Sequence, residues 1–278
     1  MIRRPFGTTG VDVPVIGQGT WKLRNARSAE RALRLGVELG LTHIDTAELY
    51  TGAEEILAPL LRDHRAKLFV VSKVLPEHAT RGGIQKACEQ SLKRLGTDHL
   101  DAYLLHWLTE EVELGEAIGA LEALVEQGKT RFIGVSNFEP HELDEARRLA
   151  TRHPIACNQV LYHLGDRGIE SALLPRCDEA GVAVVGYSPF GDGEFPPGRP
   201  AARRALTDIA ERHGRTARQV ALNFLTRHRA TFAIPKAETE AHVRDNAAAL
   251  DFTLDDAALA ELDRAFPPPP AGEPLGTL

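Results

Sequence analysis

The chain has 278 residues, 43% of them hydrophobic, and its 39 acidic and 33 basic side chains give a formal charge of −6. This length suits a single α/β domain with a large core, and we expect one domain over residues 1–278. The acidic balance argues against a nucleic-acid partner, because the scattered arginines form no basic stripe to neutralise phosphates.

The apolar runs have the length of strands, well short of the roughly 20 residues that a membrane span needs. The N-terminal residues are basic, but no apolar segment follows them as in a secretory signal. The three cysteines are widely spaced and odd in number, which fits neither a disulfide framework nor a zinc cluster. We therefore expect reduced thiols, no membrane contact and a cytoplasmic location.

Short apolar runs alternate with amphipathic segments along most of the chain. The expected strands are 15–20, 41–45, 68–73, 100–106, 131–136, 155–160, 182–188 and 231–236. The expected helices are 28–39, 53–62, 81–95, 115–127, 139–150, 170–180, 203–228 and 239–249. Eight strands, each followed by a helix, predict parallel pairing with helices outside, and the economical closure is a (β/α)8 TIM barrel. An open doubly wound sheet is the alternative.

The two ends of the chain lie outside this repeat. We expect the first helix to begin after Ser28 and to end at Gly40. Before the first strand, RPFGTTGVDVPVIG (4–17) predicts a β-hairpin that closes the bottom of the barrel. The proline-rich segment 266–278 cannot form a helix or a ladder strand, so we expect an exposed tail.

Polar side chains stand where the expected strands end, and these ends build the active site of a (β/α)8 barrel. From the second strand to the eighth, they are Asp45, Lys73, His106, Ser136 with Asn137, Asn158 with Gln159, Tyr187 with Ser188, and Lys236. One such residue could be ordinary surface polarity. Convergence at every end indicates a binding pocket.

The stretch HIDTAELY places Asp45 and Tyr50 five residues apart at one strand end. An ammonium group beside a phenol lowers its pKa, and a carboxylate beside the ammonium offsets its burial, so we expect Lys73 between them. His106 would hydrogen-bond a substrate oxygen. These groups suit proton donation to the alkoxide that forms when a hydride reaches a carbonyl carbon. The alternative is a polar network that only plugs the barrel mouth.

Other chemistries lack their motifs. No HExxH is present, so we expect no metal, and GVSNF is not the G-x-S-x-G of a serine hydrolase. No G-x-G-x-x-G dinucleotide fingerprint occurs either.

Nine segments, in order and nearly end to end, resemble the aldo-keto reductase family, especially its bacterial small-aldehyde reductases of the methylglyoxal type. They are GQGTW (17–21), IDTAELY (44–50), VSKV (71–74), YLLHW (103–107), GVSNF (134–138), NQVLYH (158–163), GYSPF (186–190), IPKAET (234–239) and DNAAALDF (245–252). The resemblance implies an NADP-dependent oxidoreductase that reduces carbonyl groups, with Tyr50 as proton donor. The implied catalytic tetrad is Asp45, Tyr50, Lys73 and His106.

The resemblance also implies NADPH lying extended across the barrel top. The expected cofactor-binding residues are Ser136, Asn137, Gln159, Tyr187, Ser188, Lys236, Thr239, His242 and Asn246. Tyr187 would stack on the nicotinamide; Ser136, Asn137 and Gln159 would bind its carboxamide. Ser188 and the loop FGDGEF would lie over the pyrophosphate, and Asn246 would face the adenine.

The phosphate site implied by the resemblance is incomplete. Lys236 and Thr239 match the family's site for the 2′-phosphate, but His242 stands where many relatives have arginine. An imidazole is mostly neutral and cannot make the charged, two-point contact with a phosphate that arginine makes. We expect NADPH, helped by Arg244, with NADH possible.

Trp21 and Trp107 are expected to wall the substrate pocket. The short loop after Trp107 and the brief tail predict an open, wide pocket that takes small aldehydes, dicarbonyls and ketones without a preference for steroids. We expect a monomer. The alternatives are a cofactor-binding regulatory subunit with little turnover and a metal-dependent barrel hydrolase.

Overall fold

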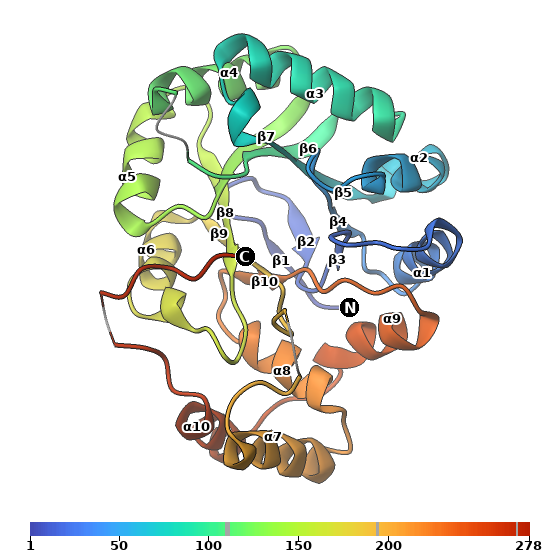
Figure 1. The fold of residues 1–278 in the computed structure, drawn as a ribbon, viewed down its shortest axis with the longest axis vertical. Coiled ribbons are helices and arrows are strands. Elements are labelled where there is room, and N and C mark those ends of the chain that lie inside the picture. The colour runs from blue at the N-terminus through green and yellow to red at the C-terminus, as the bar shows by residue number, and fades with distance from the viewer. Residues whose placement is uncertain (109–111, 193–194, 271) are drawn as a thin grey trace.

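A closed ring of parallel strands forms the centre of the computed structural model, which describes residues 1–108, 112–192, 195–270 and 272–278. Within these ranges the ring follows chain order: β3 (Gln18–Gly19), β4 (His43–Asp45), β5 (Phe69–Val74), β6 (Leu100–Leu105), β7 (Thr130–Ser136), β8 (Ile155–Leu161), β9 (Ala183–Tyr187) and β10 (Thr231–Ala233). Parallel bridges from Ile16 to Ala233 and from Gly19 to Lys236 join the first strand to the last. The predicted TIM barrel is confirmed (Figure 1).

Helices surround the strands on the outside (Figure 1). They are α1 (Ala26–Glu38), α2 (Ala53–His64), α3 (Arg81–Leu95), α4 (Leu114–Glu126), α5 (Pro140–Leu149), α6 (Leu173–Ala180), α7 (Pro200–His213), α8 (Ala217–Leu225), α9 (Glu240–Ala247) and α10 (Asp256–Ala265). Their apolar faces pack on outward-facing strand residues such as Ile44, Val70 and Val184, which are fully buried. Each such side chain contributes about 1.5–3 kcal/mol relative to exposure. Among the helices of the described ranges, none has the length and apolar character to cross a membrane.

The predicted hairpin is present and lies beneath the barrel. Strands β1 (Arg3–Pro5) and β2 (Asp12–Pro14) pair antiparallel. Phe6 follows β1 and packs its ring on Phe69 and Phe232, with centroids 4.8 and 5.2 Å away. Gly7 has φ +57°, and a Cβ there would lie 2.4 Å from a backbone oxygen of Ala156, so only glycine allows this close approach.

Alternation along the strands decides which residues face the barrel interior. His43 and Asp45 on β4 are two apart, as are Phe69, Val71 and Lys73 on β5, so each set shares one face. The interior near the bottom is formed mainly by aromatic rings around His43, and most of its polar side chains lie at the C-terminal strand ends. This gradient delivers the predicted site residues to the top of the barrel.

Three predictions about helices were wrong. The expected helix 203–228 is two helices, because Gly214 ends α7 in a left-handed conformation (φ 61°) and Thr216 begins α8 with a capping box. Helix α10 was not predicted, although Asp255 accepts the backbone N–H of Ala258 as its N-cap. Helix α1 begins earlier than expected, with Asn25 as N-cap and Ser28 as the residue that its side chain binds.

The tail was expected to be exposed, and part of it is not. Its prolines form no helix or strand, but Leu275 donates its backbone N–H to Glu139 Oε1 (2.7 Å) and is half-buried. Gly276 packs so closely that a Cβ would lie 2.0 Å from Asp166 Oδ2. The last residues thus cross the barrel mouth, where Figure 1 places the C-terminus over the strand ring. Loop-to-loop packing of this kind has no periodic sequence signal.

Candidate active site

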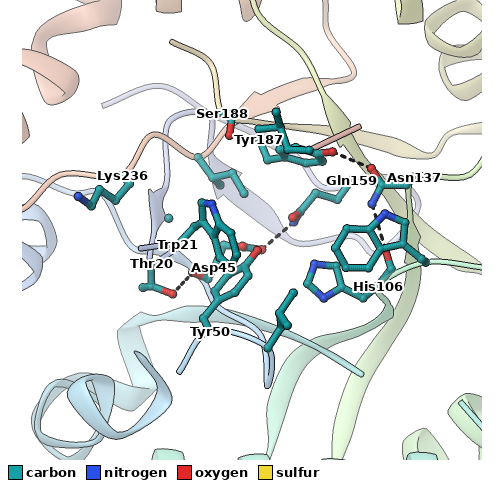
Figure 2. Close-up of a pocket in the computed structure, with 15 residues that line it drawn as sticks. Thr20, Trp21, Asp45, Tyr50, His106, Asn137, Gln159, Tyr187, Ser188 and Lys236 are labelled. Carbon is teal, nitrogen blue, oxygen red and sulfur yellow. Dashed lines mark hydrogen bonds between the residues drawn. The ribbon is translucent and has the colours of Figure 1, made fainter. Parts of the chain in front are cut away.

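Three of the predicted catalytic residues, Asp45, Tyr50 and His106, lie together at the top of the barrel (Figure 2), and hydrogen bonds join the fourth, Lys73, to the first two. Lys73 is fully buried, and its Nζ lies 2.7 Å from Asp45 Oδ1 and 2.7 Å from the backbone oxygen of Thr46. Its third neighbour is Tyr50 OH, 3.4 Å away. The three ammonium hydrogens therefore have three oxygens to bind, and the predicted carboxylate–ammonium–phenol chain is present.

Asp45 has further partners that fix its orientation. Its second carboxylate oxygen accepts a hydrogen bond from Gln159 Nε2 at 2.7 Å, and its backbone oxygen accepts one from Thr20 Oγ1 at 2.9 Å. Burial raises the pKa of Asp45, while Lys73 and Gln159 oppose that rise. Burial alone would lower the pKa of Lys73, but Asp45 and Tyr50 more than offset it and raise that pKa.

The predicted lowering of the Tyr50 pKa is wrong in direction for the protein without ligands. Removal of water raises the pKa of the Tyr50 phenol, Lys73 opposes the rise only in part, and Asp45 adds to it. The sequence reasoning counted the cation but not the desolvation. The phenol consequently stays protonated at neutral pH, as a proton donor must.

Tyr50 is held by its neighbours on several sides. Its ring lies 4.8 Å from that of Trp21 and 5.8 Å, edge to face, from that of His106. Glu48 accepts the backbone N–H of Leu75 at 2.5 Å, tying the loop that carries Tyr50 to the end of β5. This use of Glu48 was not predicted, although HIDTAELY contains it.

His106 is a neutral imidazole at physiological pH. Burial, and to a lesser degree the charge of Lys73, lower its pKa to about 2. The ring stacks on Trp107 with centroids 4.0 Å apart. Its Nδ1 is buried and has no hydrogen-bond partner within the described ranges. A neutral ring next to Tyr50 can donate one hydrogen bond but cannot supply a positive charge.

Asn137 connects His106 to Tyr187 across the strand ends. Its Nδ2 donates to the backbone oxygen of His106 (3.1 Å), and its Oδ1 accepts from Tyr187 OH (2.9 Å). Asn137 (φ 61°) and Ser188 (φ 48°) directly follow β7 and β9 in the left-handed conformation. Non-glycine residues adopt it rarely, and such strain gathers at functional sites.

The cavity above these residues contains most of the predicted pocket. Its lining residues are Gly19, Thr20, Trp21, Asp45, Leu49, Tyr50, His106, Trp107, Asn137, Gln159, Tyr187, Ser188, Ile234, Lys236 and Leu278. Trp21 and Trp107 line this cavity, and their role in binding substrate stays a prediction. Gly19, Thr20, Leu49, Ile234 and Leu278 were missed. Thr20 ends the predicted strand 15–20, which is a usable signal, whereas Leu278 reaches the cavity only through the docked tail.

The predicted open pocket is therefore narrower than expected on the side of the tail. Leu278 forms part of its wall, and the half-buried Leu275 and Gly276 anchor the tail beside it. The loop after Trp107, on which the prediction also depended, lies partly outside the described residues, as does the predicted pyrophosphate loop FGDGEF.

A second groove continues from the first. The two share Trp21, Ser188 and Lys236, and the second is also lined by Gly191 and Arg218. Together they form one channel, in which Tyr50 lies in the first groove and Lys236 lies where the two grooves meet. A salt bridge of 2.9 Å from Lys22 to Asp192 joins two loops on its rim.

The ammonium group of Lys236 in this channel is paired with a carboxylate. Lys236 Nζ lies 2.9 Å from Glu238 Oε2, and the other oxygen of Glu238 accepts the backbone N–H of Arg24. Glu238 was not predicted to matter, although it stands two residues after Lys236.

Four predicted cofactor residues do not line either groove. Thr239 is the N-cap of α9 and accepts the backbone N–H of His242, which is exposed, while Asn246 is buried on the same helix. Ser136 lies beneath the pocket and donates its hydroxyl to the backbone oxygen of Gln159. The role of these four residues stays a prediction. In the part of the chain that the structure describes, no group of three or more His, Cys, Asp or Glu side chains is arranged to hold a metal ion.

Comparison with known proteins agrees with this geometry. A profile of the Aldo/keto reductase family matches residues 15–266. The chain is 44% identical to the methylglyoxal reductase YeaE of Escherichia coli (strain K12), over 93% of each chain, and 33% identical to the glyoxal reductase of Bacillus subtilis (strain 168), over 91% and 89%. An aldo-keto reductase from Klebsiella pneumoniae, solved in complex with NADPH, superimposes with a TM-score of 0.92 at 40% identity and 100% coverage of both chains.

Proposed function

The chain belongs to the aldo/keto reductase family, and from that membership we propose that it reduces small aldehydes, dicarbonyls and ketones with NADPH, using Tyr50 as the proton donor. One observation carries the proposal. Tyr50 OH lines the cavity while Lys73 and Asp45 form a buried ion pair directly behind it. A phenol backed by an ammonium group and open to a cavity suits proton donation more than structural packing.

The channel along the barrel top fits an extended dinucleotide. Its lining includes Tyr50 and Tyr187 in the first groove, and Ser188 and Lys236 where the two grooves meet. When bound, the cofactor supplies the hydride. The amides of Asn137 and Gln159 would orient its nicotinamide end, and Lys236 would face the phosphate end.

The side chains act on the substrate oxygen as charge develops there. His106, neutral and beside Tyr50, would donate a hydrogen bond to the carbonyl oxygen and hold it near the phenol. Tyr50 would then give its proton to that oxygen. Lys73 stabilises the negative charge left on the phenol, so its interaction with Tyr50 is stronger after the transfer than before.

The substrate cavity favours small uncharged carbonyl compounds. Its walls include Trp21, Trp107, Ile234 and Leu278, and Lys236 lies on the side of the proposed cofactor. The methylglyoxal and glyoxal reductases among the relatives support substrates of this size. A bulky steroid ketone showing the highest kcat/KM would contradict this assignment.

The test is the loss of NADPH absorbance with methylglyoxal and a panel of aldehydes, run in parallel with NADH. We expect Tyr50→Phe to lower kcat about 10²- to 10⁴-fold, the usual contribution of a positioned acid, with NADPH affinity nearly unchanged. An unaffected rate would remove Tyr50 from this role. A wild-type protein that binds NADPH without turnover on any carbonyl would favour the regulatory subunit. Size-exclusion chromatography tests the proposed monomer.

A further inference from the structure

Gln159 has a contact that its expected role at the nicotinamide does not require. It lies on β8, is 1% exposed, and donates from Nε2 to Asp45 Oδ2 at 2.7 Å. The other Asp45 oxygen is bound by Lys73 at 2.7 Å. The carboxylate thus accepts from an ammonium group on one side and from an amide on the other.

The direction of this hydrogen bond fixes the orientation of the Gln159 amide. An ionised carboxylate only accepts hydrogen bonds, so the amide nitrogen must face Asp45. The amide oxygen is then left for the cavity that Gln159 lines. Its backbone oxygen is occupied as well, by Ser136 Oγ and the Asn137 N–H at 2.8 Å each, which holds β8 in register beside β7.

We propose that Gln159 is a positioning residue that links the nicotinamide site to the proton-donor chain through its single amide group. This rests on the proposed function. A carboxamide N–H bound by the Gln159 oxygen would hold the Gln159 nitrogen on Asp45. The bound carboxamide would thus keep the amide in the orientation that it already has without cofactor. Asp45 would stay ionised and Lys73 protonated, so that Lys73 can stabilise the charge on Tyr50 as the phenol gives up its proton.

The surroundings of Asp45 make this link measurable. Its titratable neighbours are Lys73 from β5, Tyr50 from the loop after β4 and Cys157 from β8, whose thiol pKa is raised by burial. His43 and His106 face Lys73, and burial lowers their pKa values to about 3 and about 2, so both are neutral near pH 7. Lys73 and the Gln159 amide are therefore the groups that hold the carboxylate ionised.

The first experiment uses the protein without cofactor. The Asp45 carboxyl is followed by ¹³C NMR of aspartate-labelled protein over a pH range, and its signal is assigned by its absence in Asp45→Asn. We expect Gln159→Leu to raise the pKa of Asp45 by about one unit, because a hydrogen bond to a charged group is lost. Ser136→Ala is the matched control: it removes a neighbouring polar group that does not touch Asp45. An unchanged titration in Gln159→Leu overturns the proposal.

The second experiment uses the complete reaction. The acid limb of the pH profile of kcat/KM should move up by about one unit in Gln159→Leu, while Ser136→Ala should leave the position of this limb unchanged. In Gln159→Glu, the protonated carboxyl can still donate to Asp45, so activity should recover as pH falls. If Gln159→Leu does not fold, Gln159→Glu carries the test, and a profile parallel to the wild type overturns the link.

The two proposals fail separately. A wild-type protein that reduces no carbonyl with NADPH contradicts the proposed function, while the NMR titration still measures the contact between Gln159 and Asp45. An active wild type whose Gln159 variants keep the normal titration and pH profile contradicts the link alone.

Discussion

The barrel contains two buried histidines, one at each end of its interior, and they differ in what surrounds them. His43, near the bottom, lies among the rings of Phe6, Phe69 and Phe232, with centroids 5.7 to 6.4 Å away. Neither of its nitrogens has a hydrogen-bond partner within the described ranges. His106, at the top, faces Tyr50 and the cavity. Burial lowers the pKa of both.

The comparison separates burial from chemical use. At the bottom, an imidazole takes the place of another apolar ring and has no proton acceptor or donor to work with. At the top, the same group lies beside a phenol that an ammonium and a carboxylate support. A shifted pKa alone therefore does not mark a functional residue; the partners and the access to a cavity do.

Lys73→Met should give the largest effect, because it breaks the polar chain at its centre. Asp45 would keep its contact with Gln159 but lose its cation, and an unpaired buried charge costs about 3–5 kcal/mol. We expect the free energy of unfolding to fall by that amount at pH 7, and less at lower pH, where Asp45 takes up a proton. Urea unfolding at pH 5 and pH 7 measures this, and kcat should fall at least 10²-fold.

A double variant distinguishes stability from catalysis at this position. Asp45→Leu with Lys73→Met removes both charges, so stability should recover toward that of the wild type while activity stays lost. If the double variant were no more stable than Lys73→Met alone, the ion pair would not be the source of the loss.

His43→Leu is expected to act in the opposite direction. Removing two unpartnered nitrogens from an apolar site should stabilise the protein by about 1–3 kcal/mol at pH 7. The pKa of His43 is depressed to about 3 when folded, against about 6.5 when unfolded, so its contribution to stability is present above pH 6.5 and lost as pH falls toward 3. As the pH falls from 6.5 toward 3, the free energy of unfolding of the variant should fall by about 1.4 kcal/mol less per pH unit than that of the wild type. Urea unfolding between pH 4 and pH 7 measures this difference.

We expect His43→Leu to keep the activity of the wild type, because His43 does not line the cavity. In His106→Leu the free energy of unfolding should also depend less on pH in the acid range, because the pKa of His106 is depressed to about 2. This variant should, however, lose most of its turnover. Equal kinetic losses in both variants would contradict the assignment of function to the top of the barrel alone.

The sequence predicted the top of the barrel well because the relevant signals are local. Strands appear in the sequence as short apolar runs, and the polar residues that end them lie in the pocket or, like Lys73 and Ser136, directly behind or beneath it. Asp45, Tyr50, Lys73 and His106 could therefore be placed from strand ends alone. The hairpin was also predictable, since its turn residues and alternation lie within fourteen positions.

What the sequence did not reveal depends on contacts between distant segments. The direction of the Tyr50 pKa shift follows from how much water the neighbouring rings exclude, which no motif encodes. Gln159 meets Asp45 across 114 positions of sequence. The docking of the tail results from the fit of Gly276 against Asp166, and the break between α7 and α8 was hidden by apolar periodicity on both sides of Gly214.

Glu238→Gln tests how much the carboxylate of Glu238 weakens the positive charge that Lys236 offers to a cofactor. Glu238 lies 2.9 Å from Lys236, so removing its charge should leave the lysine free to meet a 2′-phosphate. We expect the ratio of kcat/KM with NADPH to that with NADH to rise about three- to tenfold, a modest effect because the pair is partly exposed. Steady-state kinetics with each cofactor at several salt concentrations measure it.

Glu240→Gln is the control for Glu238→Gln. Glu240 is a carboxylate two residues further along, lies 4.0 Å from Arg244, and is exposed on α9. The substitution Glu240→Gln removes one negative charge from the same surface, and Glu240 does not contact Lys236. A similar change of the cofactor ratio in both variants would indicate a general effect of net charge instead of the Lys236 pair.

Gly276→Ala should have the smallest effect and bears on the tail at the barrel mouth. The new Cβ would lie 2.0 Å from Asp166 Oδ2, so either this carboxylate or the tail must shift, and we expect the tail to move Leu278 away from the cavity wall. We expect the KM for a hydrophobic aldehyde to rise about two- to threefold, since part of one apolar contact is lost, with the KM for methylglyoxal nearly unchanged. Leu278→Ala removes the side chain without moving the tail and should reproduce the change. If only Gly276→Ala raised the KM, the tail would act through the position of Asp166 and not through Leu278.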